Sequence, residues 1–70
     1  MRGWTTIYVA LEGEGVDAWR PVGARREGTY YRIVAETPAD EAWAFPSGAL
    51  VRCEERELSD GPVLVAVEAV

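Results

Sequence analysis

Short segments rich in β-forming residues, separated by turn signals at regular intervals, constrain the fold of this chain most. In residues 5–11 the side chains alternate, with Ile7, Val9 and Leu11 on one face, which is the pattern of a half-buried strand. Similar segments lie at residues 18–26, 29–36, 43–45, 49–58 and 63–70. A flat sheet would leave one face bare, whereas a small barrel fills its interior with alternate side chains. The sequence therefore predicts an all-β domain over residues 1–70, a small SH3-like barrel of five or six short antiparallel strands.

The connecting segments carry residues typical of turns. Thr37, Pro38 and Asp40 have the capping and first-turn chemistry of a helix start, so at most one helical turn is expected near residues 38–42. Pro46 and Gly48 predict a type I turn over residues 45–48, and a further turn is expected over residues 59–62. Residues 12–17 form a predicted acidic loop. A compact OB-like barrel is less favoured, because that fold usually needs a helix and a longer chain.

The second and third predicted strands form a hairpin, with residues 27–28 as its two-residue loop. This loop places Arg25 opposite Tyr30 and Ala24 opposite Tyr31. Because directly opposed residues share a face of a sheet, the two faces can be separated. The expected core face holds Val22, Ala24, Tyr31 and Ile33, and the outer face holds Trp19, Pro21, Arg25, Tyr30, Arg32 and Val34. Pro21 cannot donate to a ladder, so it predicts an edge or a bulge. Arg20 falls on the core side at the rim, where it needs a carboxylate or open water.

The last predicted strand is apolar on nearly both faces. Val63, Val65 and Val67 are expected to face the core, which leaves Leu64, Ala66 and Val70 on a second apolar face. This second face either packs within the barrel or mediates self-association. The protein is therefore expected to be a monomer or a weak homodimer.

The composition lacks most of the side chains that enzymes use for chemistry. The chain has no His, Lys, Asn or Gln and a single cysteine, Cys53, so a nucleophile would have no nitrogen base beside it. Cys53 is expected to be a small buried hydrophobe, and the acidic residues to be solvated surface charge. We therefore expect no enzymatic activity, no catalytic residue, no cofactor and no metal site. With no apolar segment long enough to cross a bilayer, we expect a cytoplasmic protein without membrane contact.

Several short strings resemble those of a family of short, stand-alone bacterial proteins of uncharacterised function. They are residues 17–22 (DAWRPV), 31–33 (YRI), 43–48 (WAFPSG), 51–54 (VRCE) and 65–68 (VAVE), which together span most of the chain. The resemblance implies an SH3-like fold. It implies no activity and no catalytic residues.

The outer face of the predicted hairpin is the strongest candidate for a binding site. Trp19, Arg25, Tyr30 and Arg32 interleave aromatic and cationic groups, which are frequent in protein interfaces and also suit single-stranded nucleic acid. The alternative is a purely structural role, in which Trp19 covers Gly23 and packs beside arginine stems. A formal net charge of −5 disfavours nucleic acid relative to a protein. The expected function is a small non-catalytic protein- or peptide-interaction module, and the alternative is a nucleic-acid-associated accessory protein.

Overall fold

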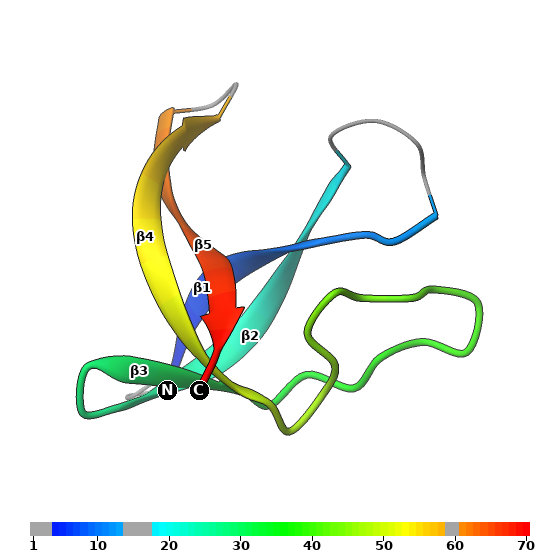
Figure 1. The fold of residues 1–70 in the computed structure, drawn as a ribbon, viewed down its shortest axis with the longest axis horizontal. Coiled ribbons are helices and arrows are strands. Elements are labelled where there is room, and N and C mark those ends of the chain that lie inside the picture. Colours follow the sequence, from blue (N-terminus) through cyan, green and yellow to red (C-terminus); the bar gives the residue numbers. More distant parts are fainter. Residues whose placement is uncertain (1–3, 14–17, 59–60) are drawn as a thin grey trace.

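Five β-strands form a closed barrel in which each strand lies beside the next (Figure 1). The computed structural model describes residues 4–13, 18–58 and 61–70, and this part of the chain contains no helix. The prediction of an all-β, SH3-like barrel is therefore confirmed, with five strands. They are β1 (Trp4–Ala10), β2 (Trp19–Glu27), β3 (Tyr30–Ile33), β4 (Leu50–Leu58) and β5 (Gly61–Ala69). Residues 14–17 of the predicted acidic loop and 59–60 of the predicted turn lie outside the described residues.

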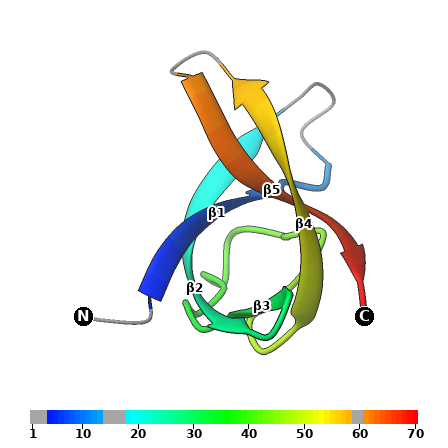
Figure 2. The same cartoon turned by 90° about the vertical axis from the view of Figure 1, so that its left-hand side faces the viewer.

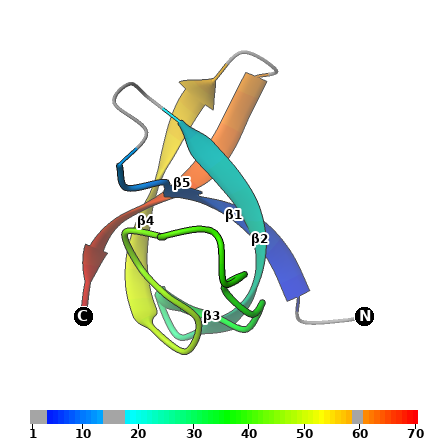
Figure 3. The same ribbon diagram turned by 90° about the vertical axis from the view of Figure 1, so that its right-hand side faces the viewer.

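Consecutive strands are antiparallel, and the barrel closes between its first and last strands. An odd number of strands in such a meander makes β1 and β5 run parallel, and they pair through Tyr8 and Val65. The two strands cross at this point and then diverge, so that the ends of β1 and β5 near the two termini lie on opposite sides of β3 (Figures 2 and 3). Closure at one register position leaves both strands with unpaired edges away from the crossing.

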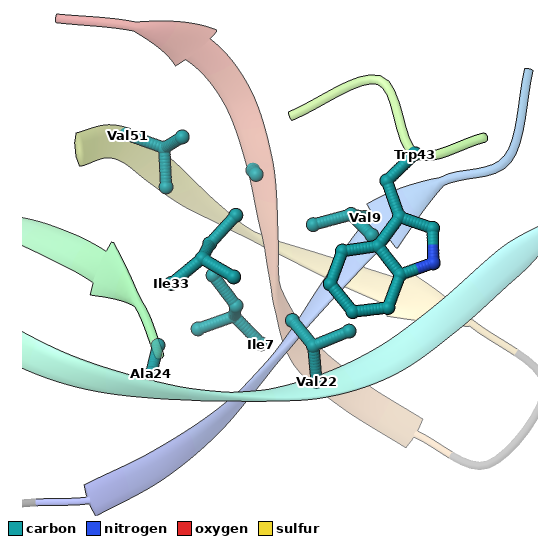
Figure 4. Packing of buried hydrophobic residues seen from close by; sticks show 8 residues of the cluster. Ile7, Val9, Val22, Ala24, Ile33, Trp43 and Val51 are labelled. Atoms are coloured by element: carbon teal, nitrogen blue, oxygen red, sulfur yellow. The ribbon is translucent and has the colours of Figure 1, made fainter. Parts of the chain in front are cut away.

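In β1, β2 and β3 the interior is filled by the alternate side chains that the sequence pattern predicted. Ile7 and Val9 of β1 and Val22 and Ala24 of β2 point together into the interior, with the ring of Trp43 entering from the connection between β3 and β4 (Figure 4). The full cluster comprises Ile7, Val9, Val22, Ala24, Ile33, Trp43, Val51 and Ala66. The predicted short strand at residues 43–45 is reduced to one bridge between Trp43 and Leu11. The predicted helical turn is one hydrogen-bonded turn, in which Glu41 N–H donates to Pro38 O at 3.1 Å.

The predicted register of the β2–β3 hairpin is wrong by two residues. Glu27 lies opposite Tyr30, and the loop is formed by Gly28 and Thr29, because Gly28 supplies the positive φ of 65° that the turn requires. Arg25 therefore faces Arg32 and Ala24 faces Ile33. A shift of two residues leaves every side chain on its face, so the separation into core and outer faces holds. Pro21 lies where β2 pairs with β1 and not with β3, as its missing N–H predicts.

The predicted faces of the last strand are also wrong. A register shift between Arg52 and Cys53 interrupts the β4–β5 ladder, and beyond it Cys53 pairs with Ala66. Ala66 joins the core cluster and Leu64 packs against it, whereas Val65 is fully buried outside that cluster. Val65 shares its face with its partner Tyr8, which is itself half-buried.

The turn before β4 lies one residue later than predicted. Ala49 N–H donates to Pro46 O at 3.1 Å, so the turn comprises residues 46–49. Gly48 occupies its third position with a φ of 88°, which is the geometry of a type II turn and not of type I. A residue with a Cβ atom is strained at this φ.

Gly23 and Gly48 should respond in opposite directions to alanine substitution. A Cβ atom at Gly23 would lie 3.5 Å from Cε3 of Trp4 and 3.9 Å from Cγ2 of Val34, which are ordinary contacts in an extended strand. Gly23→Ala should therefore stabilise the fold by about 0.4–1 kcal/mol, since it restricts the unfolded chain. Gly48→Ala should destabilise it by about 1–2 kcal/mol. Urea unfolding of both variants measures the difference, and a lower midpoint for Gly23→Ala would contradict the contact geometry.

Candidate functional site

The outer face of the barrel near the two termini carries one row of side chains across four strands. Trp4 of β1 lies opposite Arg25 of β2, which lies opposite Arg32 of β3, which lies opposite Leu50 of β4. Opposed residues share a face, so these four side chains stand side by side on the outside of the sheet. The adjacent row begins with Glu27 and Tyr30. We call the set Trp4, Arg25, Glu27, Tyr30 and Arg32 the aromatic–arginine surface.

Three of the four predicted binding residues meet on this surface, and Trp19 does not. Trp19 pairs with Ala10, six residues along β2 from Arg25, which is about 20 Å in an extended strand. Trp4 takes the place expected for Trp19 and also covers Gly23. Trp4 is 61% exposed, the largest exposure of any aromatic residue in the described ranges. The signal for Trp4 was the alternation of β1, continued one residue toward the N-terminus.

Glu27 binds both arginines of the surface. Arg32 donates to it from Nε at 3.2 Å and from Nη2 at 3.0 Å, and Arg25 donates from Nη2 at 3.1 Å. The hydrogen bonds from Arg32, followed by those from Arg25, hold the pKa of Glu27 below its ordinary value. Glu27 in turn raises the pKa of Arg32. Two cations sharing one carboxylate leave a formal charge of +1 on this surface.

The two arginines have different roles. Nη1 of Arg32 also donates to Gly48 O at 3.1 Å, so Arg32 ties the hairpin to the turn before β4. Arg25 makes a single ion pair and its side chain is 55% exposed. Arg32 is therefore primarily structural, and Arg25 is the cation with donors available to a partner.

An open cleft of about 340 Å³ adjoins the surface on the β4–β5 side. It is lined by Tyr30, Arg52, Glu68, Ala69 and Val70. Arg52 is held by Glu68 through Nε at 2.8 Å and by Glu54 through Nη1 at 3.0 Å. Trp4, Tyr30 and Val70 are the exposed large hydrophobic residues of the described ranges, and two of them line this cleft. The apolar exposure of the molecule is thus concentrated at the end of the barrel that carries the aromatic–arginine surface.

The opposite rim of the barrel confirms the expectation for Arg20. Its guanidinium pairs with Glu41, which also accepts a hydrogen bond from Nε1 of Trp43 at 2.8 Å. The bond from Trp43, followed by that from Arg20, lowers the pKa of Glu41. These contacts fix the ring that closes the core, so this charged pair has a structural role.

Cys53 and three glutamates of the described residues have pKa shifts opposite to those that catalysis requires. Burial raises the pKa of the Cys53 thiol to about 11, so it is protonated at neutral pH and a poor nucleophile. Hydrogen bonds from arginines lower the pKa of Glu27 and Glu54, and those from Trp43 and then Arg20 lower that of Glu41, which is opposite to the shift that a general acid needs. Within residues 4–13, 18–58 and 61–70, no three acidic or cysteine side chains converge to hold a metal ion.

Comparison of the chain with protein-family models, with curated proteins and with solved structures gives no match. In the described part of the chain, no helix has the length and hydropathy required to cross a membrane. The assignment of a function therefore rests on the surface itself.

The arginine–glutamate pairs predict how stability depends on pH. Glu27, Glu41 and Glu54 have lower pKa values in the folded protein than their ordinary value of 4.5, so the folded state binds fewer protons than the unfolded chain. Their contribution is complete above about pH 4.5 and is lost as the pH falls through the folded pKa values. Because the chain has no His, the Tm should be nearly constant between about pH 6 and 8. Calorimetry across the range tests this, and a Tm that rises on acidification would contradict the assigned pairs.

Proposed function

We propose that this protein is a small non-catalytic interaction module whose aromatic–arginine surface contacts a partner protein or peptide. The observation that carries the proposal is the 61% exposure of Trp4 directly opposite Arg25. Tryptophan, tyrosine and arginine are the residues that most often dominate binding energy in protein interfaces. The contact with Gly23 leaves most of the indole in water, and burial of the rest by a partner would be favourable.

Charge favours a protein partner over nucleic acid. Glu27 holds Arg32 through two hydrogen bonds and Arg25 through one, so Arg25 is the arginine with donors available to a partner, and one such arginine is too few for a chain of phosphates. The chain as a whole carries −5, which repels a polyanion. The nucleic-acid-associated accessory role remains the second candidate, because Trp4 and Tyr30 could stack on bases.

A cytoplasmic location would suit a chain whose single cysteine leaves no intramolecular disulfide.

Selection of peptides from a random displayed library on the immobilised protein tests the proposal. The selected peptides should bind Trp4→Ala and Arg25→Ala at least about tenfold more weakly than the wild type. Arg56→Ala is the matched control, because Arg56 is 52% exposed and makes one 3.1 Å ion pair, as Arg25 does. Equal binding to the wild type and to both surface variants would exclude this surface.

A thymidine oligonucleotide serves as the second probe. The proposal predicts negligible binding at physiological salt. Tight binding that weakens steeply between about 50 and 200 mM salt would instead establish the nucleic-acid role.

A further inference from the structure

The edge of β1 that faces away from β2 is unpaired near the N-terminal end of the strand. β1 pairs with β2 along its whole length, from Trp4 to Ala10, but meets β5 only at Tyr8. Beyond that crossing the two strands diverge (Figure 2). Alternate residues of a strand direct their N–H and C=O groups to each edge. The stretch from Trp4 to Ile7 therefore presents backbone donors and acceptors that no described strand satisfies.

This edge lacks the features by which proteins usually protect an unpaired strand. Charged side chains, proline and bulges discourage pairing with another chain. The unpaired parts of the other described strands do contain charged residues or proline. β4 has five charged residues between Arg52 and Glu57, β2 has Arg20 and Pro21, and β5 has Glu68. Residues 4–7 of β1 are Trp-Thr-Thr-Ile, uncharged and with three β-branched residues. By composition and geometry this edge is suited to receive another strand.

The side chains beside the edge favour an acidic partner. A strand added to β1 would lie two strand spacings from β2, or about 9.6 Å. An outward side chain opposite Trp4 would then lie in the same row as Arg25, with the β1 position of Trp4 between them. Arg25 is exposed and bound by a single carboxylate, so an extended guanidinium can reach over Trp4 to a second one. The indole ring covers Gly23, the next outward position of β2 from Arg25, so it lies beside this path, where it can also contact the guanidinium.

We propose that the free edge of β1 from Trp4 to Ile7 binds an extended segment of a partner protein as an added strand, with a carboxylate of that segment paired to Arg25. This inference rests on the proposed function and names the partner's chemistry. Backbone hydrogen bonds supply the pairing, and Trp4 and Arg25 supply the selectivity. The order of strands becomes partner, β1, β2, β3 and β4 across one continuous outer surface.

Three end-blocked peptides and amide NMR of the intact protein test this inference. The probe is Ser-Val-Thr-Glu-Val-Thr-Ser, compared with the same peptide carrying Lys in place of Glu and with a version methylated at alternate backbone nitrogens. The acidic peptide should shift the amides of residues 4–7 and the indole of Trp4, and should bind about tenfold more tightly than the Lys peptide. The methylated peptide should not bind, because it cannot pair with the edge. Placing the change in the peptide leaves the barrel intact.

The variants separate the contributions of charge and edge. Arg25→Ala should abolish the preference for Glu over Lys, and Arg56→Ala should preserve it. Failure of the acidic peptide to bind, binding that tolerates methylation, or shifts confined to the cleft at Tyr30 would overturn the added strand. A second copy of this chain could occupy the edge in place of a partner protein, and sedimentation at several concentrations tests this. A dimer whose interface maps to residues 4–7 would overturn the binding of a partner segment. The proposed function has a separate test. It would be contradicted if the peptides selected from the library bound Trp4→Ala and Arg25→Ala as tightly as the wild type.

Discussion

Replacing Ile7 with alanine should remove most of the stability of the fold and populate the unfolded state measurably at room temperature. Ile7 is completely buried and lies at the centre of the core cluster (Figure 4). Truncation of a buried isoleucine costs about 2–5 kcal/mol, because the surrounding side chains collapse only partly into the cavity. A single core in a chain of this size supplies roughly 3–5 kcal/mol in total. Far-UV circular dichroism and urea titration measure the folded fraction directly.

Two further variants make this prediction quantitative. Ile7→Val should cost about 0.5–1.5 kcal/mol and leave a folded protein with a lower urea midpoint. Val70→Ala should change stability by no more than about 0.5 kcal/mol, because Val70 is 66% exposed. A cooperative, native-like transition for Ile7→Ala, close to that of Val70→Ala, would show that the core at Ile7 tolerates a cavity.

The interior could be predicted from the sequence because strand periodicity is a local property. Alternation places Ile7 and Val9 on one face of β1, and no information from distant residues is needed for that assignment. The hairpin register was wrong by two residues, yet Val22 and Ile33 remained in the core, because an even shift preserves faces. The fold class was thus insensitive to an error in the turn.

The errors that put a side chain on the wrong face or in the wrong site lie where one strand depends on a distant one. The register shift beside Cys53 is set by how β4 and β5 curve to close the barrel, and it places Ala66 in the cluster that Val65 was expected to join. The choice of Trp19 over Trp4 had the same origin. Arg25 was assigned to the correct face, but its neighbour across β1 is set by the β1–β2 register, which no short turn in the described residues determines.

The position of the candidate site follows from the same topology. A meander of five strands must close through a parallel pair, and here that pair is limited to one crossing. This closure at Tyr8 leaves the edge of β1 that faces away from β2 without a described strand a few residues away, near Trp4. Trp4 and Arg25 flank this edge, so the unprotected strand and the exposed interface residues occur at the same place. Both observations direct a partner to one end of the barrel.

Trp43→Ala should destabilise the fold by about 3–5 kcal/mol, which is comparable to the whole stability of the domain. Trp43 lies in the connection between β3 and β4 and is only 7% exposed. Its ring closes the core beside Val9, and its neighbours bind the end of β1, where Ala44 N–H donates to Ala10 O at 2.8 Å. Loss of the ring would therefore open a cavity and loosen the long connection. Thermal unfolding monitored at 222 nm measures the effect.

Trp43→Phe separates the apolar contribution from that of the indole hydrogen bond. Phenylalanine fills most of the cavity but cannot donate to Glu41, which keeps Arg20 as its remaining partner. The stability of the variant should therefore lie between those of the wild type and Trp43→Ala. Trp19→Ala is the matched tryptophan control, because Trp19 is only half-buried and lies outside the core cluster. A larger loss for Trp19→Ala than for Trp43→Ala would mean that the connection between β3 and β4 does not complete the core.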